Sequence, residues 1–118
     1  MNYDAVEILF AEDSIDDATL TIRALVKSGF TNKLYHVKDG AEALDFIYCR
    51  GMYASRNINE KPKLILLDLK MPKLTGMEVL EKIKSDPNFK SIPVVILTSS
   101  NEDPDVQKCY ALGANSYI

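Results

Sequence analysis

The chain has few of the features that mark secreted, membrane-spanning or nucleic-acid-binding proteins. Its two cysteines, Cys49 and Cys109, fit neither a disulfide framework nor a CxxC metal site, which favours a reducing, cytoplasmic setting. No apolar run is long enough to span a bilayer, and the N-terminus has no signal-peptide character. A net charge of -3 offers no basic surface for direct nucleic-acid binding.

The length of the chain bounds its organisation. The 118 residues contain no internal repeat and no low-complexity stretch. A chain of this size is typical of one domain and buries roughly 60–70% of its unfolded surface, which is enough for a single core without disulfides. We therefore assign residues 1–118 to one domain.

Strand-like and helix-like patterns alternate along the chain. The strand-like segments are short and apolar, as in strands buried on both faces of a sheet, and lie at roughly 5–11, 34–37, 63–68, 94–97 and from 115 onward. Helical spacing of apolar residues follows each of the first four, over about 15–28, 40–51, 76–86 and 104–113. This alternation predicts a flavodoxin-like α/β fold, a doubly wound parallel sheet of five strands in the order 2-1-3-4-5.

Two local expectations accompany this fold. The apolar residues of the first helix are predicted to form one buried stripe made of Leu20, Ile22, Leu25 and Val26. Residues 51–62 are rich in turn-forming residues and show no sustained period, so they are predicted to form a surface loop.

Oxygen-bearing side chains stand at the ends of three of the predicted strands. Glu12 and Asp13 follow the first strand, and Asp68 ends the third. Thr98 follows the fourth. The carboxyl ends of parallel strands meet at one edge of the sheet, where open α/β sheets bind their ligands. Each residue alone is common at a strand end, but together they predict a cluster of three carboxylates and a hydroxyl.

Such a cluster is suited to a hard divalent cation. Three neighbouring carboxylates repel one another, and Mg²⁺ relieves the repulsion because it takes octahedral oxygen ligands and keeps several waters. Asp13 and Asp68 are expected to bind the metal directly, and Glu12 directly or through water. The backbone carbonyl of Lys70 would add a ligand. Beside the metal, Asp68 is a candidate nucleophile for phosphoryl transfer, and the Thr98 hydroxyl can donate to the phosphoryl oxygens.

The motifs around these residues resemble the receiver domain of bacterial two-component response regulators. The matching stretches cover essentially the whole chain in order, at 8–13, 66–72, 75–76, 95–99 and 113–118. The longer loop at 51–62 and the segment 86–93 are most similar to single-domain regulators paired with phytochrome-type or hybrid histidine kinases.

The resemblance implies a phosphorylation switch. Asp68 would accept the phosphoryl group from a sensor histidine kinase or phosphotransfer protein, with Glu12 and Asp13 completing the Mg²⁺ pocket. Thr98 would bind the phosphoryl oxygens, and Tyr117 would be the switch aromatic that then turns inward. The surface of the fourth helix and the fourth and fifth strands would bind a downstream protein or a second copy of the chain. Such a module catalyses only its own phosphotransfer and dephosphorylation and is not an enzyme with a separate substrate.

Three other protein classes share parts of this pattern. A haloacid-dehalogenase-like phosphatase requires a second aspartate two residues after the nucleophile, where Lys70 stands. A flavin or nucleotide binder requires a phosphate-binding loop after the first strand, where Glu12 and Asp13 would repel phosphate unless a metal is bound. A receiver-shaped interaction domain that is not phosphorylated stays open, because one residue of the family pattern is missing.

The missing residue is a lysine near the C-terminus. Receiver domains continue past the fifth strand to a Lys-Pro pair, whose lysine binds the acceptor aspartate and then the phosphoryl group, and to a last helix. The sequence stops at Ile118, and none of Lys63, Lys70 and Lys73 matches the position of that lysine. We expect the natural protein to be longer, since a chain truly ending there would expose core surface and lose stability or self-associate.

Overall fold

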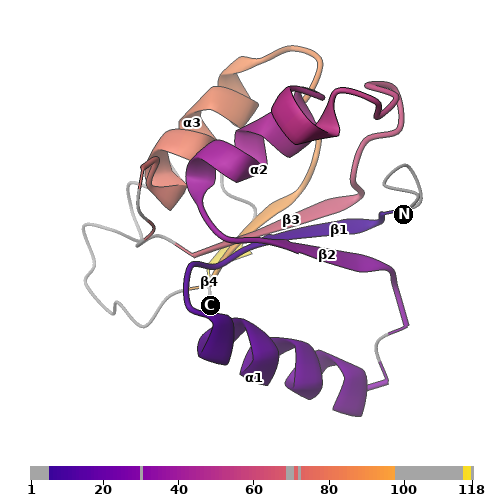
Figure 1. Ribbon diagram of the computed structural model, residues 1–118, viewed down its shortest axis with the longest axis vertical. Coiled ribbons are helices and arrows are strands. Elements are labelled where there is room, and N and C mark those ends of the chain that lie inside the picture. Colours follow the sequence, from indigo (N-terminus) through magenta and orange to yellow (C-terminus); the bar gives the residue numbers. More distant parts are fainter. Residues whose placement is uncertain (1–5, 30, 69–70, 72, 98–115, 118) are drawn as a thin grey trace.

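The architecture is a parallel sheet with helices on both faces (Figure 1). The computed structural model describes residues 6–29, 31–68, 71, 73–97 and 116–117. The strands are β1 (Ile8–Ala11), β2 (Leu34–Val37), β3 (Leu64–Asp68), β4 (Val94–Leu97) and β5 (Ser116–Tyr117), in the order β2-β1-β3-β4-β5. The predicted fold class and strand order are therefore confirmed.

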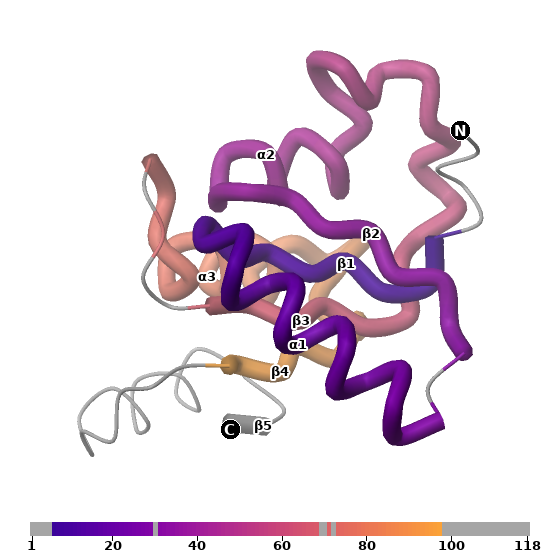
Figure 2. The backbone as a smooth tube through the Cα atoms, turned by 60° about the horizontal axis from the view of Figure 1, so that its bottom comes forward, coloured from indigo at the N-terminus to yellow at the C-terminus, as the bar shows by residue number. Residues whose placement is uncertain are grey.

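Three described helices cover the two faces of the sheet. They are α1 (Ile15–Lys27), α2 (Gly40–Ile47) and α3 (Gly76–Ser85). α1 lies on one face, and α2 and α3 lie side by side on the other (Figure 1; Figure 2). The predicted fourth helix, over 104–113, lies outside the described residues. In the part of the chain that the structure describes, no helix has the length and apolar character needed to cross a membrane.

The register of the sheet aligns the carboxyl ends of β1, β2 and β3. All four residues of β1 are buried, because the strand is apolar on both sides and helices cover both. Ala11, the last residue of β1, lies beside Val37 at the end of β2 and beside Leu67 in β3. The residues that follow β1, β2 and β3 therefore emerge together at the carboxyl edge of the sheet.

A capping side chain begins each described α-helix. The Ser14 hydroxyl accepts a hydrogen bond of 3.2 Å from the backbone N–H three residues later, as its place before α1 predicts. Asp39 caps α2, and Thr75 forms a capping box with Glu78 at the start of α3. Because Ser14 and Asp39 lie within three residues of the ends of β1 and β2, their bonds fix the direction of the chain as it leaves the carboxyl edge.

The predicted buried stripe of α1 is partly wrong. Ile22 and Leu25 do pack against the sheet, together with the buried Ala18. Leu20 is 62% exposed and Val26 is 63% exposed. Leu20 stands two positions from both Ala18 and Ile22, and therefore points to the opposite side of a helix with 3.6 residues per turn.

Replacing Leu20 with glutamine is therefore expected to change the free energy of unfolding by less than about 0.5 kcal/mol, as for surface positions in general. Leu44, which is buried in α2, provides the matched comparison. Leu44→Ala is expected to lower the free energy of unfolding by about 2–4 kcal/mol. Urea titrations of both variants measure the two effects, and a loss at Leu20 as large as the one at Leu44 would contradict the exposed placement.

The segment 51–62 is not a simple surface loop. It contains a short 3₁₀ helix (Gly51–Tyr53), and the side chains of Tyr53 and Arg56 are buried. The Arg56 guanidinium lies over the Phe46 ring and donates hydrogen bonds to the backbone carbonyls of Phe46 and Glu60. The helix before this segment is shorter than predicted, because α2 ends at Ile47 and not near residue 51. Turn-forming residues correctly predicted irregular backbone, but they carry no information on which side chains that backbone turns inward.

Candidate functional site

The ends of β1 and β3 bring three carboxylates together. Because Ala11 lies beside Leu67, the next residues along the two strands, Glu12 and Asp68, are neighbours at the carboxyl edge. Carboxylate oxygens of Glu12, Asp13 and Asp68 all lie within 4.8 Å of one another. The gathering of these three side chains, predicted from their places at strand ends, is therefore present in the structure.

Glu12 is held in place by the neighbouring strand and by the start of α1. Its backbone N–H donates to the carbonyl of Val37 over 3.0 Å, and its own carbonyl lies 2.6 Å from Nε2 of His36. Its side-chain Oε1 accepts a hydrogen bond of 3.1 Å from the backbone N–H of Ser14. The side chain has little freedom, because the residue is only 9% exposed.

The environment of Glu12 disfavours a negative charge. Burial raises the pKa of its carboxyl to about 7 from an ordinary value of 4.5, and the neighbouring carboxylates of Asp68 and Asp13 add to the effect. The hydrogen bond from Ser14 acts in the opposite direction but is outweighed. In the absence of a cation, the Glu12 carboxyl with this raised pKa keeps its proton to a higher pH than an ordinary glutamate, which relieves the repulsion.

A hard divalent cation fits this set of donors. The three carboxylates offer only oxygen atoms, which Mg²⁺ and Mn²⁺ prefer, and they are close enough to share one ion. Asp13 is exposed and Asp68 is partly exposed, so waters can complete an octahedral shell. The arrangement is also suited to nucleophilic chemistry, because it holds the side-chain oxygens of Asp68 beside the place that a cation would take.

The structure does not place every predicted member of the site. Lys70 and Thr98 lie outside the described residues. Tyr117 is in β5, where its backbone is paired in register with Ile96 of β4, and its side chain lies outside the described part of the chain. The expected roles of these three residues stay predictions.

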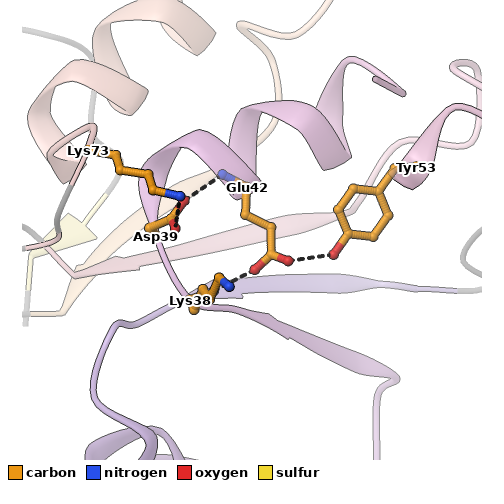
Figure 3. A network of polar contacts seen from close by, with 5 residues as sticks. All are labelled: Lys38, Asp39, Glu42, Tyr53 and Lys73. Carbon is orange, nitrogen blue, oxygen red and sulfur yellow. Dashed lines mark hydrogen bonds and ion pairs between the residues drawn. The ribbon is translucent and has the colours of Figure 1, made fainter. Parts of the chain in front are cut away.

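A second polar group, which the sequence did not predict, lies at the same edge of the sheet. Asp39 follows β2, and its carboxylate forms an ion pair with Lys73, in the connection between β3 and α3 (Figure 3). Asp39 stands directly before the predicted start of the helix at residue 40, where a capping aspartate is common, and α2 does begin there. Nothing in the sequence showed that the carboxylate would be buried or which lysine would reach it.

Comparison with known proteins identifies the family. The family model described as "Response regulator receiver domain" matches residues 8–118. Response regulator Rcp1 of Synechocystis sp. is 41% identical over 94% of this chain and 74% of its own. A structure of Mn²⁺-bound Rcp1 aligns over 94% of this chain and 78% of that one with a TM-score of 0.84.

Two further solved structures are similar. Bacteriophytochrome response regulator RtBRR is 47% identical, with a TM-score of 0.86 over 94% of this chain and 66% of that one. The phosphorylated cyanobacterial phytochrome response regulator RcpA is 42% identical, with a TM-score of 0.84 over 97% of this chain and 80% of that one. With the family match over residues 8–118 and the acidic cluster at the sheet edge, the chain belongs to the response regulator receiver family of two-component signalling and is similar to phytochrome-associated regulators.

Proposed function

We propose that Asp68 accepts a phosphoryl group from the phosphohistidine of a sensor histidine kinase or phosphotransfer protein, and that this modification switches a protein-binding surface. The observation that carries the proposal is the cluster of Glu12, Asp13 and Asp68, whose carboxylate oxygens lie within 4.8 Å of one another. Membership of the receiver family supports the same role.

The transfer requires a well-placed nucleophile. A carboxylate oxygen of Asp68 attacks the phosphorus, the phosphorus–nitrogen bond of the phosphohistidine breaks, and the electron pair of that bond stays on the imidazole nitrogen. The product is an acyl phosphate on Asp68. Pairing of β3 with both β1 and β4 holds the aspartate at the edge of the sheet, so the chain supplies the fixed position on which phosphoryl transfer depends.

The proposed cofactor is Mg²⁺, held by Glu12, Asp13 and Asp68 with the backbone carbonyl of Lys70. When bound, the ion neutralises charge on the transferred group. The all-oxygen donor set supports this assignment, and the similar protein Rcp1 has been solved with Mn²⁺ bound. Glu12 must release its proton before it can act as a carboxylate ligand, so binding is expected to weaken as the pH falls below about 7, the pKa of its carboxyl.

The output is proposed to follow from Thr98 and Tyr117. The Thr98 hydroxyl would bind the phosphoryl oxygens, and Tyr117 would then turn inward and alter the surface near β4 and β5. A downstream protein or a second copy of the chain would bind that surface in the cytoplasm. To convert a mostly inactive population, the phosphoryl group must favour the active form by several kcal/mol. The similarity to RtBRR and RcpA supports a phytochrome-type kinase as the donor.

Phosphorylation by a small donor tests the proposal without the unknown kinase. The protein is incubated with acetyl phosphate and Mg²⁺, and its intact mass is measured over time. Wild type is expected to gain one phosphoryl group that hydroxylamine removes, and Asp68→Asn is expected to react at least about 100-fold more slowly because it lacks the nucleophile. Asp16→Asn, an exposed aspartate in the first turn of α1, is the matched control and should react like wild type.

Two outcomes would overturn the proposal. Wild type that gains no phosphoryl group with Mg²⁺ would not be a phosphoacceptor, and would support the alternative of an interaction domain of receiver shape. Equal modification of wild type and Asp68→Asn would place the phosphoryl group on another residue. Removal of Mg²⁺ with EDTA is expected to stop the reaction of wild type.

A further inference from the structure

An ion pair joins the connection that leaves Asp68 to the start of α2 (Figure 3). Nζ of Lys73 lies 3.5 Å from Oδ2 of Asp39. The Asp39 side chain is 4% exposed, whereas that of Lys73 is 64% exposed. The other carboxylate oxygen of Asp39 accepts a hydrogen bond of 2.7 Å from the backbone N–H of Glu42. Asp39 therefore does two things at once, because it caps α2 and holds the lysine of a different segment.

Both partners occupy unfavourable positions. The backbone of Lys73 has a φ of 67°, a left-handed conformation that residues other than glycine and asparagine rarely adopt. A buried carboxylate such as that of Asp39 is costly unless it is paired and hydrogen-bonded. The ion pair offsets the cost of burying the carboxylate, and it ties the side chain of Lys73 to the start of α2. A lysine held in a strained conformation suggests that the position of this connection matters.

The same connection is fixed on both sides of Lys73. Met71 is buried in the core on the α2 and α3 face of the sheet. The backbone of Leu74 packs so closely on Gly40 that a Cβ atom added to Gly40 would lie 2.1 Å from the carbonyl oxygen of Leu74. Thr75 caps α3. The described residues of this connection, Met71, Lys73, Leu74 and Thr75, are thus attached to the core, to α2 or to α3.

The start of α2 is itself anchored. Glu42 accepts hydrogen bonds of 2.8 Å from the backbone N–H of Lys38 and of 3.0 Å from the hydroxyl of Tyr53. The Tyr53 ring is fully buried, and its hydroxyl lies 2.9 Å from that of Tyr35 in β2. Asp39 therefore presents its carboxylate from a part of the protein that is tied to the sheet. It can hold Lys73 in place, whereas a freely moving partner could not.

We propose that Asp39 and Lys73 are positioning residues for phosphoryl transfer to Asp68. Their ion pair holds the connection after the acceptor in the geometry that the reaction requires. The inference rests on the proposed function and extends it to two residues outside the cluster of Glu12, Asp13 and Asp68. Because phosphoryl transfer depends on orientation within fractions of an ångström, release of this connection slows the reaction even though Asp68 is intact.

The test compares Asp39→Asn and Lys73→Gln with wild type. Asparagine keeps the cap of α2, and glutamine keeps most of the lysine stem, so each change mainly removes a charge. The initial rate of phosphorylation is measured against acetyl phosphate concentration at saturating Mg²⁺. We expect the maximal rate to fall about five-fold in each variant, with less than about a two-fold change in the half-saturating donor concentration. The double variant should be no slower than either single one, because both remove the same pair.

Two control variants and a hydrogen-exchange measurement separate positioning from a general loss of stability. Lys63→Gln breaks an exposed ion pair with Glu7 that lies before β3 rather than after it, and should leave the rate unchanged. Lys73→Arg keeps the charge and should restore most of the rate. Without metal or donor, hydrogen exchange of the segment 71–77 should rise in Asp39→Asn and Lys73→Gln and stay at the wild-type level in Lys63→Gln.

The outcomes distinguish this inference from the function on which it rests. If wild type itself is not phosphorylated, the proposed function fails and the inference fails with it. If wild type reacts and Lys73→Gln reacts equally fast, only the positioning role is overturned. The same holds if Lys63→Gln slows the reaction as much as Lys73→Gln. Lys73 is exposed, so its variants keep the test decisive even if Asp39→Asn folds poorly.

Discussion

Replacing Glu12 with glutamine is expected to stabilise the metal-free protein at pH 8 by about 2 kcal/mol, because the folded protein disfavours the charge on this carboxyl. Burial and the carboxylates of Asp68 and Asp13 raise its pKa to about 7. Glutamine is neutral, nearly the same size, and keeps an oxygen to accept the hydrogen bond from the backbone of Ser14. The change therefore removes the repulsion and leaves the local structure intact.

The same shift sets the pH dependence of wild type. Between pH 4.5 and pH 7 the folded protein holds a proton on Glu12 that the unfolded chain has released. The folded state then binds more protons than the unfolded state, so this group lowers the free energy of unfolding as the pH rises through that window. Above about pH 7 its contribution is constant. Glu12→Gln is expected to lack this part of the pH dependence. Its free energy of unfolding should match that of wild type most closely near pH 4.5.

Urea denaturation at pH 5 and pH 8, with and without Mg²⁺, measures these effects. Mg²⁺ should stabilise wild type and should stabilise Glu12→Gln much less, because one carboxylate ligand is gone. Glu7→Gln is the control of opposite sign, since hydrogen bonds from Asn32 and Lys33 lower the pKa of the Glu7 carboxyl and its charge favours folding. A metal-free Glu12→Gln protein that is less stable than wild type at pH 8 would contradict the electrostatic account of the cluster.

A cluster of carboxylates that lowers the stability of the metal-free protein is typical of a functional site, where reactivity is favoured over stability. Glu12, Asp13 and Asp68 repel one another because they lie close together, and the proposed phosphoacceptor site with its cation would require that proximity. Their proximity could be predicted because it depends on two local properties, the apolar character of β1 and β3 and the residue that follows each strand. Parallel strand order then brings the strand ends together.

Other features depend on contacts between distant segments and could not be predicted. Tyr53 and Arg56 lie in a segment with the composition of an exposed loop, yet both are buried. Both side chains are buried because they pack on Phe46. Neither the composition of the segment nor the spacing of its apolar residues predicts that contact. Leu20 shows the reverse error, since an apolar residue in an amphipathic helix was expected to face the sheet and points away from it. A sequence pattern thus predicts elements more securely than the direction of single side chains.

The contact between Gly40 and Leu74 also joins distant segments of the chain. It leads to a second prediction with a large effect on stability. Gly40→Ala is expected to lower the free energy of unfolding by about 2–3 kcal/mol, although alanine is favoured over glycine in a helix by about 1 kcal/mol. The added Cβ would lie 2.1 Å from the carbonyl oxygen of Leu74 and 2.8 Å from its carbonyl carbon. These are backbone atoms of a tightly held connection, so the clash cannot be relieved by turning a side chain.

Gly29→Ala provides a matched comparison for this steric account. Gly29 has a φ of 90° and no heavy atom within 4 Å of an added Cβ, so alanine there meets conformational strain and no clash. Both variants should lose stability in urea, but only Gly40→Ala should displace the connection after Asp68. It should therefore increase hydrogen exchange over residues 71–77 and slow phosphorylation by acetyl phosphate, as we also expect for loss of the Asp39–Lys73 pair. If Gly40→Ala were as stable as wild type and reacted as fast, the close packing of α2 on this connection would have no part in holding it.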